Sequence, residues 1–126
     1  MIASPWKSFA IPQEGKDYLA LLSYLPLKQY RMIPKFLQLT GETRQQLAKT
    51  GGLVGYSVGA ELLARRFWNL SVWEDGQSLM DFVHENPHNR IMQDLVPHMG
   101  KTQFVQWTVR AAEIPIRWAD AKRRVI

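Results

Sequence analysis

The three histidines, His84, His88 and His98, are the side chains of this sequence best suited to chemistry near neutral pH. A neutral imidazole can bind iron or exchange a proton, so His88 is a candidate catalytic residue, as a haem ligand or a proton donor. The structural alternative is that Asn86 caps a helical segment, Pro87 occupies its first turn and His88 simply follows. Both interpretations of His88 stay open at this point.

A metal site built from His84 and His88 is not expected. Their spacing of four residues would place both on one face of a continuous helix. Pro87 disturbs that geometry, because proline removes a helix hydrogen bond and disfavours helical conformation at the preceding residue. His98 follows Pro97, and we expect it to be solvated. The sequence contains no cysteine, which removes disulfides, thiolate ligands and a cysteine nucleophile.

The elements that must position these residues follow the order βαββαβ. This order predicts an α+β, ferredoxin-like fold, with a four-stranded antiparallel sheet and helices on one face. The expected strands are residues 18–25, 53–62, 67–73 and 102–109. The expected helices are residues 30–49, broken near Thr40-Gly41, and a second helix interrupted at Pro87. We predict a single domain over residues 1–126, with an arm at 1–16 and a tail at 111–126 that holds a turn of helix over 117–124.

Strand 67–73 has two chemically different faces, because successive side chains of a strand point in opposite directions. The apolar face carries Trp68, Leu70 and Val72, and the polar face carries Asn69 and Ser71. We therefore expect Trp68 to lie under the helices and Trp73 to lie towards a dimer contact or the strand end. Asn69 and Ser71 could orient a ligand, or could satisfy each other and water.

Helices on one face would leave the other side of the sheet as an apolar patch. Such a patch usually marks a partner surface, and a homodimer joined sheet to sheet is the simplest solution. Trp68, Trp73 and Trp107 suit this core or interface role. They also suit the wall of a pocket for an apolar organic molecule.

Charge and hydropathy bound the partners and the location. The formal charge is +5, but the clusters at 65–66 and 122–124 are short and accompany no nucleic-acid-binding motif, so we do not expect a nucleic-acid partner. The pair Arg65-Arg66 could hold a carboxylate, although solvation is the commoner role. No apolar run approaches the roughly 18 residues of a membrane span. No secretory signal is evident at the N-terminus, and the expected location is the cytoplasm.

One long segment of the sequence carries a family resemblance. GGLVGYSVGAELLARRFWNLSVWEDGQSLMDFVHENPH, continued by NRIM, resembles the dimeric α+β barrel superfamily that contains antibiotic-biosynthesis-type monooxygenases. It looks closest to the spheroidene-monooxygenase-like branch and its bacterial relatives, over roughly residues 18–110. The resemblance implies the fold much more strongly than the chemistry, because the superfamily includes cofactor-free oxygenases, haem proteins and proteins without known activity.

The resemblance also bears on haem. Haem-degrading relatives pair an asparagine on the first strand with a tryptophan and a histidine on the second helix. Residues 18–25 contain no asparagine, and Phe82 stands about where that tryptophan would fall. This departure argues against haem degradation, while haem binding through His88 by another geometry stays open.

Two functions are therefore expected as alternatives. The first is a monooxygenase-like enzyme acting on an apolar organic substrate between sheet and helices, with or without haem. The second is a non-catalytic dimeric ligand-binding or structural protein of the same fold. The candidate catalytic residue is His88, and no metal is expected except haem iron on His88. The expected pocket-lining residues are Trp68, Trp73, Asn69, Phe82 and Trp107.

Overall fold

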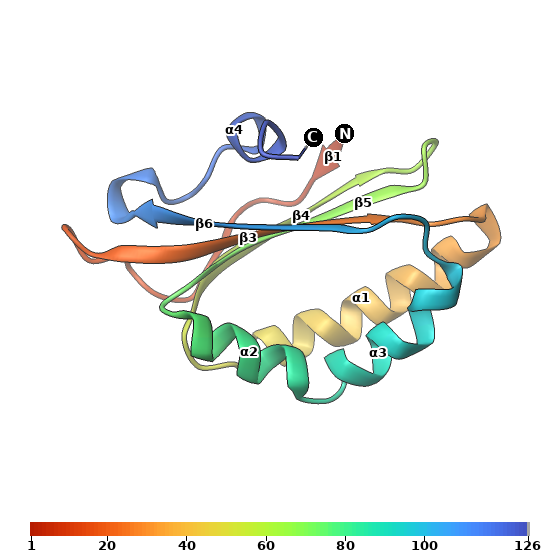
Figure 1. The fold of residues 1–126 in the computed structure, drawn as a ribbon, viewed down its shortest axis with the longest axis horizontal. Coiled ribbons are helices and arrows are strands. Elements are labelled where there is room, and N and C mark those ends of the chain that lie inside the picture. The colour runs from red at the N-terminus through yellow and green to blue at the C-terminus, as the bar shows by residue number, and fades with distance from the viewer. Residues whose placement is uncertain (126) are drawn as a thin grey trace.

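A six-stranded antiparallel sheet carries helices α1, α2 and α3 on one face, as the computed structural model shows (Figure 1). The structure describes residues 1–125. The strands are β1 (Ile2–Ala3), β2 (Lys7–Ser8), β3 (Asp17–Pro26), β4 (Leu53–Glu61), β5 (Arg66–Trp73) and β6 (Gln103–Arg110). The helices are α1 (Ile33–Leu47), α2 (Gly76–His84), α3 (His88–Leu95) and α4 (Trp118–Lys122), with 3₁₀ turns η1 (Tyr30–Met32), η2 (Val96–His98) and η3 (Ala111–Glu113).

The predicted α+β, ferredoxin-like fold is confirmed. Strands β3 to β6 are the four expected strands, and they are ordered β4-β5-β3-β6 in the sheet. The arm supplies the two further strands, which the sequence did not predict. Both β1 and β2 pair antiparallel with β4, so the arm hydrogen-bonds to an edge that would otherwise be open. No helix within residues 1–125 is long and apolar enough to cross a membrane.

Helix α1 runs without interruption, so the break predicted near Thr40-Gly41 is wrong. The Thr40 hydroxyl donates to the carbonyl of Phe36 at 2.8 Å, within the helix. Phe36, Leu39 and Leu47 are buried on one side of α1. Burial of this face outweighs the roughly 1 kcal/mol by which glycine disfavours a helix interior. The predicted interruption of the second helix at Pro87 is confirmed by the separate helices α2 and α3.

The acidic turn after β5 starts α2. The Asp75 carboxylate accepts the backbone N–H of Ser78 at 2.8 Å and caps the first turn. This hydrogen bond lowers the pKa of Asp75. The turn therefore ends β5 and fixes the direction of α2, the helix that forms one wall of the site.

The expected assignment of faces on β5 is wrong. Trp73, only 1% exposed, lies beneath the helices with its ring 5.4 Å from that of Phe82. Trp68 lies on the outer face, where its ring is 4.6 Å from that of Tyr24. Strand alternation correctly separates the two tryptophans. It does not say which face the helices cover, because here both faces of the strand are buried.

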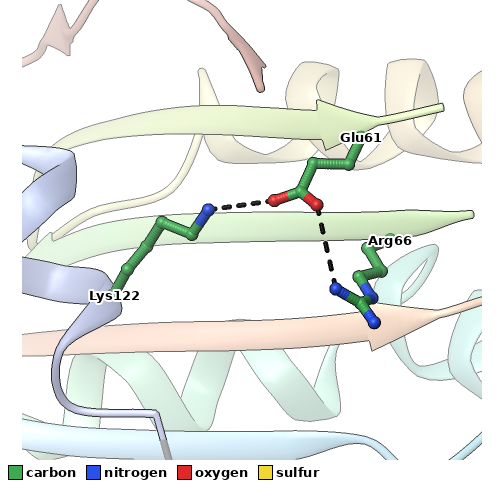
Figure 2. Close-up of polar contacts among 3 residues, drawn as sticks. All are labelled: Glu61, Arg66 and Lys122. Atoms are coloured by element: carbon green, nitrogen blue, oxygen red, sulfur yellow. Dashed lines mark hydrogen bonds and ion pairs between the residues drawn. The ribbon is translucent and has the colours of Figure 1, made fainter. Parts of the chain in front are cut away.

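The outer face of the sheet is covered by the chain's own ends, so the predicted bare apolar patch is also wrong. Trp6 from the arm and Trp118 from α4 pack against outer-face residues, and the Trp118 indole donates to the Ser57 hydroxyl at 3.1 Å. Figure 2 shows Lys122 of α4 reaching Glu61 of β4, with Nζ and Oε1 2.9 Å apart. Lys122, through its hydrogen bond, lowers the pKa of Glu61. These contacts fasten the tail to the sheet.

Candidate functional site

A cavity of about 380 Å³ lies between the sheet and helices α2 and α3. Its volume falls in the range of small-molecule sites. Its apolar walls include Leu79, Phe82, Val83 and Met92 from the helices and Trp73 from β5. Its polar groups are Ser23, Asn69, Ser71, Gln106 and His88. A larger cavity of about 520 Å³ lies beside the tail, on the other face of the sheet, but half of its lining residues are charged and none is a histidine.

His88 is held in a defined orientation at the start of α3. Its Nδ1 lies 3.2 Å from the carbonyl oxygen of Val83, and its ring centroid is 4.8 Å from that of Phe82. A carbonyl oxygen can only accept a hydrogen bond, so Nδ1 must carry the proton. In the neutral ring, Nε2 then keeps its lone pair.

Burial lowers the pKa of His88, which keeps the ring neutral at physiological pH. The hydrogen bond to Val83 opposes this shift in pKa. No hydrogen bond joins Nε2 to another of residues 1–125. The lining of the cavity therefore contains a neutral imidazole with one nitrogen available to a ligand.

Gln46 of α1 holds the junction between α2 and α3. Its side-chain oxygen accepts the backbone N–H of His88 at 2.9 Å, and its Nε2 donates to the carbonyl of Phe82 at 3.2 Å. The first bond satisfies a backbone N–H at the start of α3, and the second adds to the hydrogen bond that the Phe82 carbonyl already accepts from the Glu85 N–H at 3.3 Å. The structural alternative for His88 placed an Asn86 cap on α3, but Pro87 is the N-cap and makes no side-chain cap hydrogen bond.

Asn69 is the second notable polar group. It lies on the helix-facing side of β5, and its Oδ1 is buried without a hydrogen-bond partner among residues 1–125. The next inward residue, Ser71, is engaged, because its hydroxyl accepts the Trp73 indole N–H at 2.9 Å. Asn69 and His88 line the same cavity. A buried polar atom without a partner in the protein takes one from a bound ligand or an ordered water, and Asn69 Oδ1 can therefore accept a ligand group.

The structure brings together some of the predicted site residues and separates others. His88, Asn69, Trp73 and Phe82 all line the cavity. Trp107, like Trp68, belongs to the outer face and lies beside the tail. Gln46 was not predicted from the sequence, because its role depends on a contact between residues 42 positions apart. No local pattern signals such a contact.

The other predicted polar groups lie elsewhere. His84 is exposed at the end of α2, and His98 lies in η2. Arg65 ends the turn between β4 and β5 and Arg66 begins β5, and both lie outside the cavity lining. Within residues 1–125, no cluster of three or more His, Cys, Asp or Glu side chains could hold a metal ion.

The residues of the cavity suit haem in one respect and fail to suit it in another. His88 offers a suitable nitrogen, and its Nδ1 contact resembles the hydrogen bond that usually orients a metal-bound histidine. However, neither Lys nor Arg is among the lining residues of the described chain, so two haem propionates would have no cationic partner in the cavity. The lining fits a neutral molecule better than it fits haem.

The family is decided by the sequence match over most of the chain. The family described as "Domain of unknown function (DUF3291)" matches residues 36–126. The chain belongs to the DUF3291 family. The matched region holds most of α1, strands β4, β5 and β6, and every one of the cavity residues just described except Ser23, whereas the central strand β3 precedes it. No curated protein is detectably similar to this DUF3291 chain.

Solved structures show that the DUF3291 fold is shared with antibiotic-biosynthesis-monooxygenase-like proteins. SnoaB, a cofactor-independent oxygenase from Streptomyces nogalater, is 15% identical, with a TM-score of 0.62 over 75% of this chain and 94% of its own. A dimeric ferredoxin-like protein of unknown function from Thermobifida fusca is 14% identical, with a TM-score of 0.63 over 77% of this chain and 95% of its own. An antibiotic biosynthesis monooxygenase is 15% identical, with a TM-score of 0.64 over 71% of this chain and 95% of its own. At these identities the likeness establishes the fold alone.

Proposed function

We propose that this DUF3291 protein is a monooxygenase-like enzyme that oxidises a neutral, apolar organic molecule in the cavity between the sheet and α2–α3. The observation that carries the proposal is the state of His88. Its Nδ1 proton is engaged by Val83, its pKa is lowered by burial, and Nε2 is left as a base. Two solved structures that share this fold are described as oxygenases, and they support the same class of reaction.

The residues suggest how the reaction would begin. Nε2 of His88 would take a proton from an acidic C–H or O–H of the substrate, which leaves an electron-rich anion. Asn69 Oδ1 would accept a hydrogen bond from a second hydroxyl of the substrate and so fix the orientation of the substrate. Trp73 and Phe82 would contact the apolar faces of the substrate.

The oxidant in this proposal is dioxygen. A substrate methylene would become a carbonyl: both C–H bonds break, one oxygen atom enters the substrate and the other leaves as water. The substrate supplies all the electrons, so the balance needs no reductant. No step in this proposal passes through haem, in keeping with the absence of Lys and Arg from the cavity lining within residues 1–125.

We also propose a branch of the superfamily, an assembly and a location for this chain. Within the superfamily we place the chain nearest the spheroidene-monooxygenase-like branch, on the segment from Gly51 to His88. We propose a single domain that works as a homodimer in the cytoplasm. The dimeric Thermobifida fusca protein, which shares the fold, supports the homodimer.

The experiment is a turnover assay with a panel of neutral polycyclic phenols and anthrones, following oxygen consumption and product absorption. We expect wild type to consume oxygen, and His88→Ala to lose at least about a hundredfold in rate, the usual contribution of a general base. His84→Ala is the matched control. Binding of a panel compound in the cavity without any turnover would favour the non-catalytic ligand-binding alternative. A sharp Soret band that appears on haem addition and is lost in His88→Ala would instead establish haem binding through His88.

A further inference from the structure

One end of the molecule, here called the hairpin end, gathers three segments distant in sequence. They are the β4–β5 turn (residues 62–65), the segment 27–32 after β3 and the segment 96–101 before β6. The Leu27 N–H donates to the carbonyl of Arg65 at 2.8 Å, and the Lys28 N–H donates to the carbonyl of His98 at 2.9 Å. Figure 1 shows the three segments together at the right of the view.

The hairpin end exposes large apolar side chains. Leu63 is 90% exposed and Leu62 is 44% exposed, both in the β4–β5 turn. Tyr30 and Val96, on the two neighbouring segments, are 53% and 61% exposed. Single exposed apolar residues need no explanation, but a group of them on one end indicates an interaction surface.

The turn that presents the leucines is held in one shape. Arg65 has a φ of 55°, in the left-handed region that side chains other than glycine seldom adopt. Its guanidinium lies 4.6 Å from the centre of the Tyr30 ring, and its Nε donates to the carbonyl of Leu27 at 3.2 Å. The Tyr30 hydroxyl donates to the carbonyl of Leu63. A strained residue kept in place by several contacts suggests that the shape of this turn has a use.

The charges of the two ends of the sheet differ. Around the hairpin end lie basic residues, namely Lys28, Arg31, Lys35, Arg66 and Lys101. The acidic residues there are Asp94 and Glu61, and Glu61 is paired with Lys122 and Arg66. The opposite end, where β3 begins and β5 ends, carries the carboxylates of Glu14, Asp17, Glu74, Asp75 and Glu113 together with the basic residues Lys16, Lys49 and Arg110, so acidic groups are in excess there. This polarity would orient the protein on a negatively charged surface.

We propose that the hairpin end docks on an anionic lipid surface. Leu62 and Leu63 would enter the boundary between headgroups and acyl chains, and the surrounding lysines and arginines would face the lipid phosphates. An exposed apolar tip on a convex turn fits a fluid lipid surface, whereas a protein partner would need a complementary groove. The inference stands independently of the cavity, although an apolar substrate would itself partition into such a membrane.

The test is co-sedimentation of the full chain with phosphatidylcholine vesicles, with and without phosphatidylserine. We expect binding only when phosphatidylserine is present, and weaker binding as salt is raised. Leu63→Asn should weaken binding about tenfold, since a leucine that no longer enters the lipid loses its transfer energy. The double variant Lys28→Gln/Arg31→Gln should weaken it by about tenfold or more.

The chain offers matched controls. Ile11 is also 90% exposed but lies at the opposite end of the sheet, so Ile11→Asn should bind as wild type does. Arg117→Gln/Arg123→Gln removes two exposed tail charges and should have much less effect than the Lys28/Arg31 pair. Absence of binding to phosphatidylserine vesicles would overturn the proposal, as would equal losses in Leu63→Asn and Ile11→Asn. A dimer that becomes monomeric in Leu63→Asn without vesicles would assign the patch to a protein contact instead.

Discussion

The His88 Nδ1 and the Val83 carbonyl oxygen lie 3.2 Å apart, across the break between α2 and α3. Because the carbonyl can only accept, this contact fixes the tautomer and leaves Nε2 as the basic nitrogen. A continuous helix would have used the Val83 carbonyl in its own hydrogen-bond ladder. The interruption at Pro87 thus allows the contact that makes His88 a candidate base.

The pH dependence of stability should report on His88. Its pKa is lowered in the folded protein, so between that pKa and the unfolded value of about 6.5 the unfolded chain binds more protons. The contribution of the neutral ring to stability is complete above about pH 6.5 and is lost as the pH falls through the folded pKa. Denaturant unfolding of wild type between about pH 7 and pH 5 should therefore show a loss that His88→Gln does not show. An identical pH profile for the two proteins would contradict this expectation, and His84→Gln serves as the exposed control.

Gln46→Ala should loosen the α2–α3 junction. It removes the acceptor for the His88 N–H and the donor to the Phe82 carbonyl, so we expect a loss of about 1–3 kcal/mol in the free energy of unfolding. Ligand affinity of the cavity should also fall, because the backbone of His88 loses the contact that holds it against α1. Chemical denaturation and ligand titration measure the two effects. Gln45→Ala, at an exposed neighbour on the same helix, should change neither of them.

Substitutions of the two tryptophans of β5 should have similar effects on stability and different effects on ligand binding. Trp73→Ala and Trp68→Ala should each cost about 3–5 kcal/mol, because both rings are buried. Only Trp73 lines the cavity between sheet and helices, so Trp73→Phe should change ligand affinity and Trp68→Phe should leave it unaltered. Fluorescence titration of the two phenylalanine variants makes the comparison. A ligand response confined to Trp68→Phe would place the site on the outer face.

Lys122→Met should release the tail from the sheet. The substitution keeps an apolar stem but removes the ion pair to Glu61 and the cation 4.9 Å from the Trp68 ring. Both partners of the ion pair are partly exposed, so we expect a modest effect, a few-fold faster chymotrypsin cleavage at Trp118. Arg123→Met is the control, because its contact with Asp120 lies within the tail and is largely exposed. Equal cleavage rates in the two variants would show that Lys122 does not fasten the tail.

Local patterns in the sequence determined the elements that build the site. The aromatic and β-branched run at 67–73, the acidic turn with Asp75 and the interruption at Pro87 are all short-range signals, and the structure follows each of them. These signals work because strand propensity, helix capping and the missing proline N–H act within a few residues. They also placed His88 at a helix start next to a break.

Tertiary structure alone decided which face of β5 the helices cover. Alternation assigns Trp68 and Trp73 to opposite faces, but both faces are apolar enough to be buried, one by helices and the other by the arm and tail. The hydrophobic effect is non-directional, so it could not show which face of β5 the helices cover and which face the arm and tail cover. The contacts of Gln46 with His88 and of Lys122 with Glu61 were likewise beyond sequence reasoning, because each joins side chains that only the folded chain brings within hydrogen-bonding distance.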